Sequence, residues 1–490
     1  MKKILGTLFR LILFGGFIVA GIMVVRTLGF TSRQIAIEAI SPIDIPKGAA
    51  DRLAAALTLA TISTNSGIDT NAFSLLDTLI IEKYPLVDSM MEKIPVVPIS
   101  KVYRWPGKNA KLKPILFLAH QDVVPVEENT IDKWTAPAFG GQKADGFIWG
   151  RGALDDKTAI ISILEASEQL LSEGYVPERT IYFSFGHDEE IGGQNGAKKV
   201  ADFFARKDIH FEYILDEGLL VLENSLAGLS QPLAMIGVAE KGYLTLRLDA
   251  RLPEGGHSSM PPANSVIGIL SRAIKRLEDD PFPGKIKGAT RALFDHIGPE
   301  MSPLYRTLFA NLWLTEGIIN HQLSKDPSSS AIIRTTTAPT IIESGLKDNI
   351  MPTQASAQIN FRILPGESIA SVMARVKAVI NDERITITPQ EGIGQDEPSS
   401  VSGVGTFGFQ VIQKSIQQVS PEVLVAPALT VGLTDSRHFR NLTDDIYRFR
   451  PYQVSRQDLR TFHGINEKIS EANLATSIRF FRQLILNSCL

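Results

Sequence analysis

Two adjacent glutamates, Glu189 and Glu190, form the stretch whose residue types point most clearly to chemistry. They follow an apolar run, residues 180–185, whose β-branched and aromatic side chains predict a buried strand. In an open α/β sheet, ligands lie just beyond the carboxyl ends of the strands. Two neighbouring carboxylates repel each other unless a positive charge lies beside them, so the pair indicates a bound metal ion. A solvated acidic turn would explain the same two residues if they stood alone.

A second apolar run, residues 114–119, delivers His120 and Asp122 to the end of another predicted strand. Side chains two positions apart on a strand project to the same face, so these two residues can act together. A structural histidine with satisfied hydrogen bonds would be the simpler interpretation of His120 alone.

Three further acidic residues and one histidine occupy comparable positions. Asp155 and Asp156 follow a Gly-Arg-Gly turn and begin a predicted helix, where the helix dipole favours negative charge. Helix capping explains one aspartate, but it does not require that turn. Asp216 follows another strand-like run, and His463 precedes the final amphipathic helix of the chain.

These side chains together form a hard set of nitrogen and oxygen donors. Such a set, with no cysteine in it, suits a pair of zinc ions, or cobalt or manganese. Two metal ions can hold a hydroxide and polarise a carbonyl group, and one glutamate is then left over as a base. The chain has no His-Glu-x-x-His helix and no Gly-x-Ser-x-Gly turn, the signatures of other hydrolase sites. The residues that the set comprises are His120, Asp122, Asp155, Glu190, Asp216 and His463.

The elements that position this set alternate between strands and helices. This alternation predicts an α/β fold with a mostly parallel sheet and helices on both faces, so that the strand ends share one edge. From residue 241 the pattern changes to half-exposed strands and amphipathic helices, which predicts a smaller α+β domain inserted over 241–397. The catalytic domain then comprises 46–240 and 398–490. Residues 279–338 follow no regular pattern, and we assign no element to them.

The first 30 residues differ from the rest of the chain. Two lysines precede an apolar segment whose residues 11–25 carry no charge, which is typical of a membrane anchor or a signal sequence. We expect an uncleaved anchor with the lysines on the cytoplasmic side and the catalytic body on the other side. Cleavage of a signal sequence would instead give a secreted protein. Residues 31–45 are predicted to be a linker.

Composition narrows the range of partners. A net charge of −3 argues against a nucleic-acid partner held through phosphate contacts. The length of 490 residues is too great for one ordinary hydrophobic core, so we expect two or more domains. The single cysteine, Cys489, excludes a disulfide framework within the chain.

The motifs, taken in order, resemble those of the di-zinc aminoacylase and carboxypeptidase family, in particular the branch of carboxypeptidase S (Gly-X carboxypeptidase) and the N-fatty-acyl-amino acid hydrolases. The resemblance extends over nearly everything after residue 46. The matching blocks are residues 118–126, 150–157, 186–193, 255–262, 349–362 and 434–439, and the segment around His463.

This resemblance implies a role for each matching residue. Two zinc ions would be bound by His120, Asp155, Glu190, Asp216 and His463, with Asp155 bridging them. Asp122 would orient His120, and Glu189 would be the general base. His257 would stabilise the oxyanion, often from a second subunit, which allows for a homodimer. Substrate would be bound by Asn349, Arg362, Gly432 and Thr434, although Arg362 could equally belong to an ion pair on a strand face.

The expected activity is zinc-dependent hydrolysis of the amide bond between an acyl or aminoacyl group and an amino acid with a free carboxylate. Small peptides and N-acyl amino acids are the two substrate classes that the resemblance implies. Two alternatives come from other classes of protein. One is a non-catalytic, metal-containing binding protein on the same scaffold, and the other is a structural adaptor tethered to the membrane.

Overall fold

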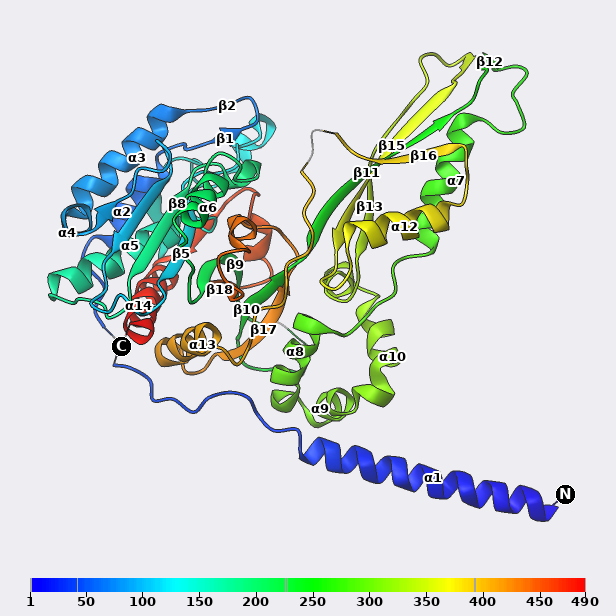
Figure 1. The fold of residues 1–490 in the computed structure, drawn as a ribbon, viewed down its shortest axis with the longest axis horizontal. Coiled ribbons are helices and arrows are strands. Elements are labelled where there is room, and N and C mark those ends of the chain that lie inside the picture. Colours follow the sequence, from blue (N-terminus) through cyan, green and yellow to red (C-terminus); the bar gives the residue numbers. More distant parts are fainter. Residues whose placement is uncertain (1, 42, 225, 227, 392–393, 490) are drawn as a thin grey trace.

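The structure is a computed structural model that describes residues 2–41, 43–224, 226, 228–391 and 394–489. Its centre is an eight-stranded sheet in the order β17-β10-β18-β9-β5-β8-β4-β3 (Figure 1). The neighbouring strands β18, β9, β5 and β8 are parallel, whereas β4 and β3 extend the sheet in antiparallel fashion. The bounds are β3 Glu92–Lys93, β4 Lys101–Trp105, β5 Ile115–His120, β8 Ile181–Gly186, β9 Ile214–Leu222, β10 Leu233–Glu240, β17 Leu424–Thr430 and β18 Ile446–Val454.

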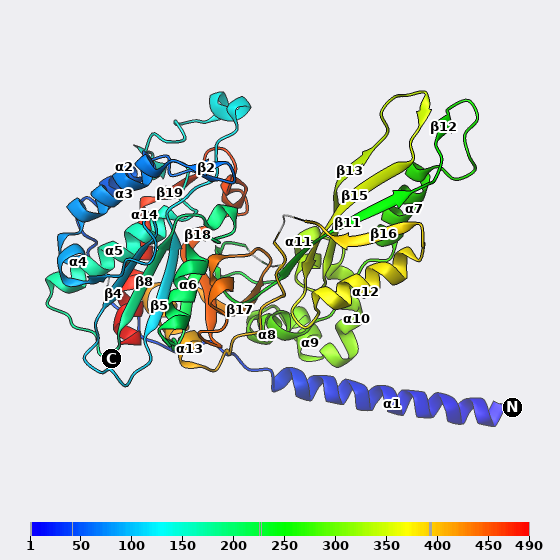
Figure 2. The same ribbon diagram turned by 45° about the horizontal axis from the view of Figure 1, so that its top comes forward.

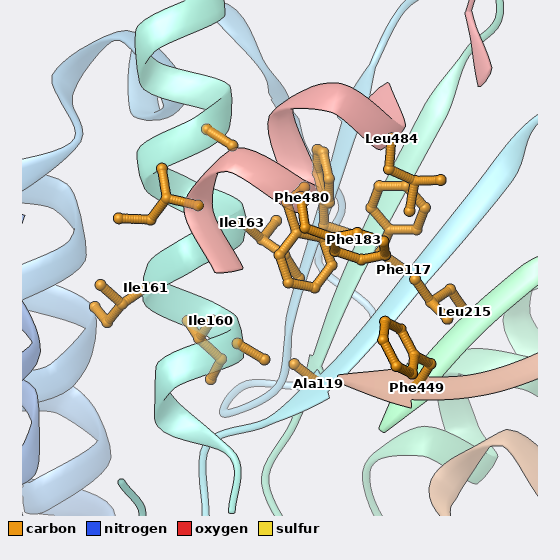
Figure 3. Packing of buried hydrophobic residues seen from close by; sticks show 14 of the residues in the cluster. Phe117, Ala119, Ile160, Ile161, Ile163, Phe183, Leu215, Phe449, Phe480 and Leu484 are labelled. Carbon is orange, nitrogen blue, oxygen red and sulfur yellow. The ribbon is translucent and has the colours of Figure 1, made fainter. Parts of the chain in front are cut away.

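Helices cover both faces of this sheet, as the sequence predicts for an α/β fold. Every residue of β5 and β8 is buried. Helices cover both faces of these strands, and this explains why their sequences are nearly continuous apolar runs without alternation. On one face, α5 (Lys157–Ser172) and α14 (Glu471–Ser488) pack against Phe117, Phe183 and Phe449 (Figure 3). On the other face lies α6 (Ala197–Arg206). Around them are α2 Ala49–Leu57, α3 Thr70–Lys83, α4 Pro85–Met90 and α13 Phe407–Val419.

A smaller domain projects from the catalytic body (Figure 2). Its antiparallel sheet has the order β13-β15-β11-β16, and α7 (Val266–Asp279) and α12 (Ile369–Ile380) contribute to its core. At its far end, the short strand β12 (Gly256–His257) pairs with β14 (Ile350–Met351). The sheet strands are β11 Gly242–Arg251, β13 Thr336–Ser344, β15 Gln354–Ile363 and β16 Ile385–Pro389.

Residues 279–338, to which the sequence assigns no element, are mainly helical. Their helices are α8 Gly288–Ile297, η3 Gly298–Glu300, α9 Pro303–Ala310, α10 Leu312–Leu323 and α11 Pro327–Ala331. Leu293 and Phe294 of α8 share a buried cluster with Leu424 and Ala426 of β17. This part of the predicted insert therefore packs against the edge of the catalytic sheet.

The N-terminal residues form one long helix, α1 (Lys2–Leu28), which is long and apolar enough to cross a membrane. The predicted linker after it lies against the catalytic body. The side-chain amide of Gln34 bonds to both backbone groups of Val425 at 2.9 Å, and Ile40 N–H donates to the carbonyl of Gln418.

Several short elements complete the chain and carry loops of the candidate site. These are β1 Ser63–Thr64, β2 Gly67–Ile68, η1 Glu128–Lys133, β6 Gln142–Ala144, β7 Phe147–Trp149, η2 Glu189–Ile191, η4 Asp435–Phe439, η5 Asp458–Thr461 and β19 Lys468–Ser470. Strands β6, β7 and β19 form a small sheet of their own, in the order β19-β7-β6.

Candidate metal centre

Asp122 holds both His120 and the glutamate pair in place. Nδ1 of His120 lies 2.9 Å from the carbonyl oxygen of Asp122 and 3.4 Å from its Oδ1. This leaves Nε2 of His120 free to face a metal ion. The carboxylate of Asp122 also accepts the backbone N–H groups of Glu189 (3.2 Å) and Glu190 (3.1 Å). The end of β5 and the turn after β8 are therefore joined through one buried carboxylate.

The carboxylate of Asp155 lies between the two predicted histidine ligands. Its Oδ1 is 2.9 Å from Nε2 of His120, and its Oδ2 is 3.0 Å from Nε2 of His463. Glu190 lies on the same side as His463, with Oε2 3.3 Å from the Nε2 of that ring. The other oxygen of Glu190, Oε1, is buried and has no hydrogen-bond partner among the described residues. An orphaned carboxylate oxygen at this position fits the role of a metal ligand.

The small sheet brings the Asp155 turn and the His463 loop together. Strand β19 pairs with β7, so the segment that leaves β7 and the segment that enters β19 lie at the same end. Glu467 fastens the two segments, because its carboxylate pairs with Arg151 at 2.5 Å and accepts the N–H of Leu154 at 2.8 Å. Arg151 in turn donates to the carbonyl of Gly464. The arginine of the Gly-Arg-Gly turn thus positions the loop that carries His463.

The structure brings Glu217, and not the predicted Asp216, to the metal centre. Oε1 of Glu217 lies 3.5 Å from Nε2 of His120. The carboxylate of Asp216 is used elsewhere, since Oδ2 accepts the N–H of Ser436 and Oδ1 accepts the N–H of Glu217, both at 2.8 Å. The expectation that Asp216 is a direct ligand therefore does not fit this arrangement.

A bulge in β9 explains the exchange of roles. Asp216 pairs with Arg448 of β18, but the next pair is Leu219 with Phe449, so two residues of β9 have no opposite partner. One of them is Gly218, whose φ of 145° suits glycine and at which a Cβ atom would lie 2.8 Å from Cβ of Arg448. Within this irregularity of two residues, the side chain of Glu217 faces His120.

Asp156 stabilises the site through a buried ion pair with Arg450. Its two oxygens accept Nε and a terminal nitrogen of Arg450, at 3.0 and 2.8 Å, and both side chains are buried. Asp156 has a carboxylate oxygen near His120 and Glu217, but the bidentate pair already occupies its acceptors. A structural role, as opposed to a ligand role, follows for this residue.

The electrostatics of the cluster favour a bound cation. Burial raises the pKa of Glu189 well above its usual range, and repulsion from Glu217 adds to this. Burial likewise raises the pKa of Glu217, with Asp155 adding to the effect. Hydrogen bonds to Asp155 and Glu190 raise the pKa of His463 to about 10. Carboxylates and imidazoles crowded in this way hold protons that metal ions would displace, so the donor set fits a pair of divalent ions.

Two predicted residues lie far from this cluster within one chain. His257 is in β12, opposite Ile350 of β14, and Asn349 accepts the N–H of Ser258 through its carbonyl. Both views place β12 at the tip of the insert, away from the carboxyl ends of β5 and β8 (Figures 1 and 2). One chain in this conformation does not bring His257 to the metal centre.

The other predicted substrate residues lie where the insert meets the catalytic domain. The guanidinium of Arg362, on β15, stacks over the ring of Tyr243 at 4.6 Å, and burial lowers its pKa. Thr434 donates through its N–H and its hydroxyl to the buried carboxylate of Glu240, at 2.9 and 2.8 Å. Its hydroxyl is therefore engaged inside the protein, whereas Gly432, just after β17, is exposed.

Comparisons with known proteins show the family to which the chain belongs. The model of peptidase family M20/M25/M40 matches residues 116–487. The chain is 42% identical to a probable carboxypeptidase S-like protein of Dictyostelium discoideum, over 95% of this chain and 91% of that one. It is 38% identical to an N-fatty-acyl-amino acid synthase/hydrolase of Danio rerio, over 99% and 96% of the two chains. The fold is similar to that of an M20 family metallo-carboxypeptidase of Sulfolobus solfataricus, with a TM-score of 0.64, 18% identity, and coverage of 91% and 100%. The chain belongs to this enzyme family, peptidase M20/M25/M40.

Proposed function

We propose that this enzyme is a zinc-dependent amidohydrolase and carboxypeptidase. It would cleave the amide bond between an acyl or aminoacyl group and an amino acid with a free carboxylate. The observation that carries the proposal is the carboxylate of Asp155, which offers one oxygen toward His120 and the other toward His463. That arrangement suits a carboxylate that bridges two metal ions.

Five residues would hold the metal ions. One ion would be held by His120 and Glu217 and the other by His463 and Glu190, with Asp155 shared between them. Zinc suits these nitrogen and oxygen donors, and cobalt or manganese would fit the same set. Bound ions of this kind supply Lewis acidity and lower the pKa of a water molecule.

Glu189 is the proposed general base. Its backbone N–H is fixed by Asp122, and the buried position of its carboxyl group raises its pKa. A carboxylate with a raised pKa accepts a proton from the attacking water more readily and can pass it to the leaving nitrogen. Asp122 contributes by orienting His120 and by holding the glutamate turn.

The amino-acid end of the substrate would lie near Arg362. Its guanidinium can donate two parallel hydrogen bonds to a carboxylate, and burial makes such a contact stronger. Gly432 would complete this binding region within the chain, with Thr434 holding the loop in shape through Glu240. The relatives named carboxypeptidase S-like and N-fatty-acyl-amino acid synthase/hydrolase support small peptides and N-acyl amino acids as the two substrate classes.

His257 and Asn349 would reach a metal centre either by formation of a homodimer or by movement of the insert toward the catalytic domain. In a homodimer, the tip of one insert can approach the centre of the partner, where His257 would stabilise the oxyanion. Strand β13 lies at the edge of the insert sheet and its residues 338–344 are exposed, which leaves it available for pairing with a second copy.

The N-terminal helix α1 would anchor the enzyme in a membrane, with the catalytic body on the non-cytoplasmic side. The apolar span Ile4–Leu28 supports this, and cleavage after it would give a secreted form. A tether of this kind suits amphipathic substrates such as fatty-acyl amino acids.

A hydrolysis screen tests the proposed reaction. Full-length enzyme in detergent is given Gly-Leu-type dipeptides and N-acyl amino acids of increasing chain length, with added zinc or with a chelator. Chelator-sensitive cleavage of either class establishes the reaction and identifies the substrate class. Efficient cleavage of dipeptides with none of N-oleoyl amino acids would remove the fatty-acyl substrates. Bound zinc with no cleavage in either class would favour the non-catalytic binding protein.

A further inference from the structure

Helices α9 and α10 expose a group of large apolar side chains beside the end of α1. Leu304, Trp313, Leu314 and Ile318 are 67%, 50%, 50% and 66% exposed, and we call this group the α9–α10 surface. Helix α10 also buries Leu312 and Ile319 on its opposite side, so its first two turns carry large apolar side chains on both sides, with Glu316 among the exposed residues. A helix of this kind is normally covered on every side, by protein or by lipid.

The chain after α1 fixes where that helix meets the catalytic body. Phe30 lies two residues beyond the end of α1, and its carbonyl accepts a hydrogen bond from Arg306 of α9 at 2.8 Å. Its ring packs so closely on Gly298 that a Cβ atom there would lie 2.5 Å from Cε1 of Phe30. Two residues span at most about 7 Å, so the end of α1 stays beside α9 at any angle between them.

The length of α1 places that end at a membrane surface. Its 27 residues correspond to about 40 Å, against about 30 Å for the hydrocarbon layer of a bilayer. The apolar span within it, Ile4–Leu28, is 0% buried against the rest of the protein. If α1 crosses a bilayer, the start of α9 lies at the level of the lipid headgroups.

We propose that the α9–α10 surface is inserted into the headgroup region of the same phospholipid bilayer that α1 crosses. This inference rests on the membrane anchoring in the proposed function and assigns the bilayer as the occupant of the surface. Trp313 has the amphipathic character that this layer favours, since its Nε1 donates to Oδ1 of Asn311 while its ring is half exposed. Apolar faces of interfacial helices insert to a depth of about 5–10 Å.

The direction of α1 determines how a bilayer would lie relative to the insert. In both views α1 extends from the body on the same side as the insert, so a bilayer perpendicular to it would also enclose the insert (Figures 1 and 2). The polar contacts of α1 with α9 and α10 come from its last turns: Asn311 bonds to Met23 and Thr27, and Arg26 to Ala310. Insertion of the α9–α10 surface requires α1 to turn away from the insert near Leu28, which breaks these hydrogen bonds and the packing of α1 on α9.

Fluorescent labels at single positions test the proposal in the full-length chain. The native Cys489 is buried, so a polarity-sensitive label reports on an introduced cysteine. The test positions are Trp313→Cys, Leu314→Cys and Ile318→Cys. Leu75→Cys on α3 is the matched control, because Leu75 is 48% exposed and Leu314 is 50% exposed. Leu346→Cys reports on the insert, and Leu13→Cys reports on α1. The protein is reconstituted in phospholipid nanodiscs with and without spin-labelled phosphatidylcholine as quencher.

The proposal expects blue-shifted emission at positions 313, 314 and 318, quenched at least twofold by the spin-labelled lipid, with aqueous spectra at 75 and 346. Aqueous spectra at the three test positions would overturn it, and so would blue-shifted emission without lipid quenching, which would indicate cover by a second protein copy. Quenching at 346 would show α1 crossing along its present direction and would overturn it as well. Quenching at the test positions but not at 13 would support insertion of the α9–α10 surface but would show that α1 does not cross the bilayer. None of these results depends on hydrolysis.

Discussion

His120 and His463 face opposite oxygens of a single carboxylate, that of Asp155, at 2.9 and 3.0 Å. One histidine ends a central strand and the other lies in a loop near the C-terminus. Because one side chain joins them, a small displacement of Asp155 would disturb both halves of the metal centre at once. Its supports are correspondingly numerous, since Glu467, Arg151 and the paired strands β7 and β19 all hold its turn.

Replacing Glu189 with glutamine should abolish turnover without releasing metal. The substitution keeps the size of the side chain and the backbone bond to Asp122 but removes the proton acceptor. We expect kcat to fall by about 10²–10⁴-fold, the usual contribution of a general base. Metal content measured by mass spectrometry should stay at two ions per chain. Near-normal turnover would place the base elsewhere.

The pair Glu217→Gln and Asp216→Asn separates a ligand from its neighbour. Glu217→Gln should lower the metal content or the metal affinity, because an amide is a poor substitute for a carboxylate ligand. Asp216→Asn should retain both ions but lower the free energy of unfolding by about 1–3 kcal/mol, because one of two buried N–H groups loses its acceptor. Measurements of the metal content and of the free energy of unfolding of both variants identify which of the two residues is the metal ligand. The reverse pattern would return Asp216 to the ligand set.

Mixing two inactive variants tests whether His257 acts across a dimer. His257→Ala and Glu189→Gln each damage every site in their own homodimers. After subunit exchange, a mixed dimer has one site with both residues intact, so activity should recover to about a quarter of the wild-type value with random pairing. A mixture of Asp155→Asn with Glu189→Gln is the control, since both changes affect the same centre and no site is restored. Equal failure in the two mixtures would exclude action in trans.

Arg362→Ala should mainly affect substrates with a free carboxylate. Loss of a charge-assisted contact should lower kcat/KM by about 10- to 100-fold for such substrates. The corresponding carboxamides should change much less. Arg247→Ala is a suitable control, because Arg247 lies on β11 of the same sheet and pairs with Asp249. Equal losses on acids and amides would remove the assigned role.

Lys241 should make stability depend on pH in the alkaline range. Burial lowers the pKa of its ammonium group to about 7, and its Nζ donates to the carbonyls of Ala331 and Arg334. Between about pH 7 and 10 the unfolded chain binds this proton more strongly than the folded chain, so stability should rise with pH there. Lys241→Met should flatten that part of the profile in thermal unfolding. An unchanged slope would assign the pH dependence to other groups.

The sequence predicts well what depends on continuous patterns. All six residues of β5 are buried, as its apolar run indicates, and His120 emerges at its carboxyl end. The strand and helix alternation likewise predicts the central sheet, because each apolar run has one stable place between two layers of helices. The resemblance to the aminoacylase and carboxypeptidase family agrees with the matched family model.

Local irregularities limit the prediction of the site. Asp216 and Glu217 are adjacent, and the sequence pattern does not show the bulge at residues 217 and 218, where Glu217 faces His120. The role of Glu467 depends on the pairing of β7 with β19, two three-residue strands that are far apart in the chain. The available signal was the arginine of the Gly-Arg-Gly turn, a buried cation that needs an acidic partner. The helices of residues 279–338 escaped prediction because α10 is apolar on both sides and shows no clear period.

The segment after α1 has a consequence for the kinetics of the enzyme. Gln34 and Ile40 hold it on the body, so it is not a flexible leash between membrane and catalytic domain. A protein on a flexible leash samples all orientations, and its active site meets a membrane-bound substrate only part of the time. If α1 anchors the enzyme in a membrane as proposed, the held segment keeps the active site at a nearly constant height above the lipid surface. Encounters with substrates dissolved in that surface then become a search in two dimensions, set by lateral diffusion.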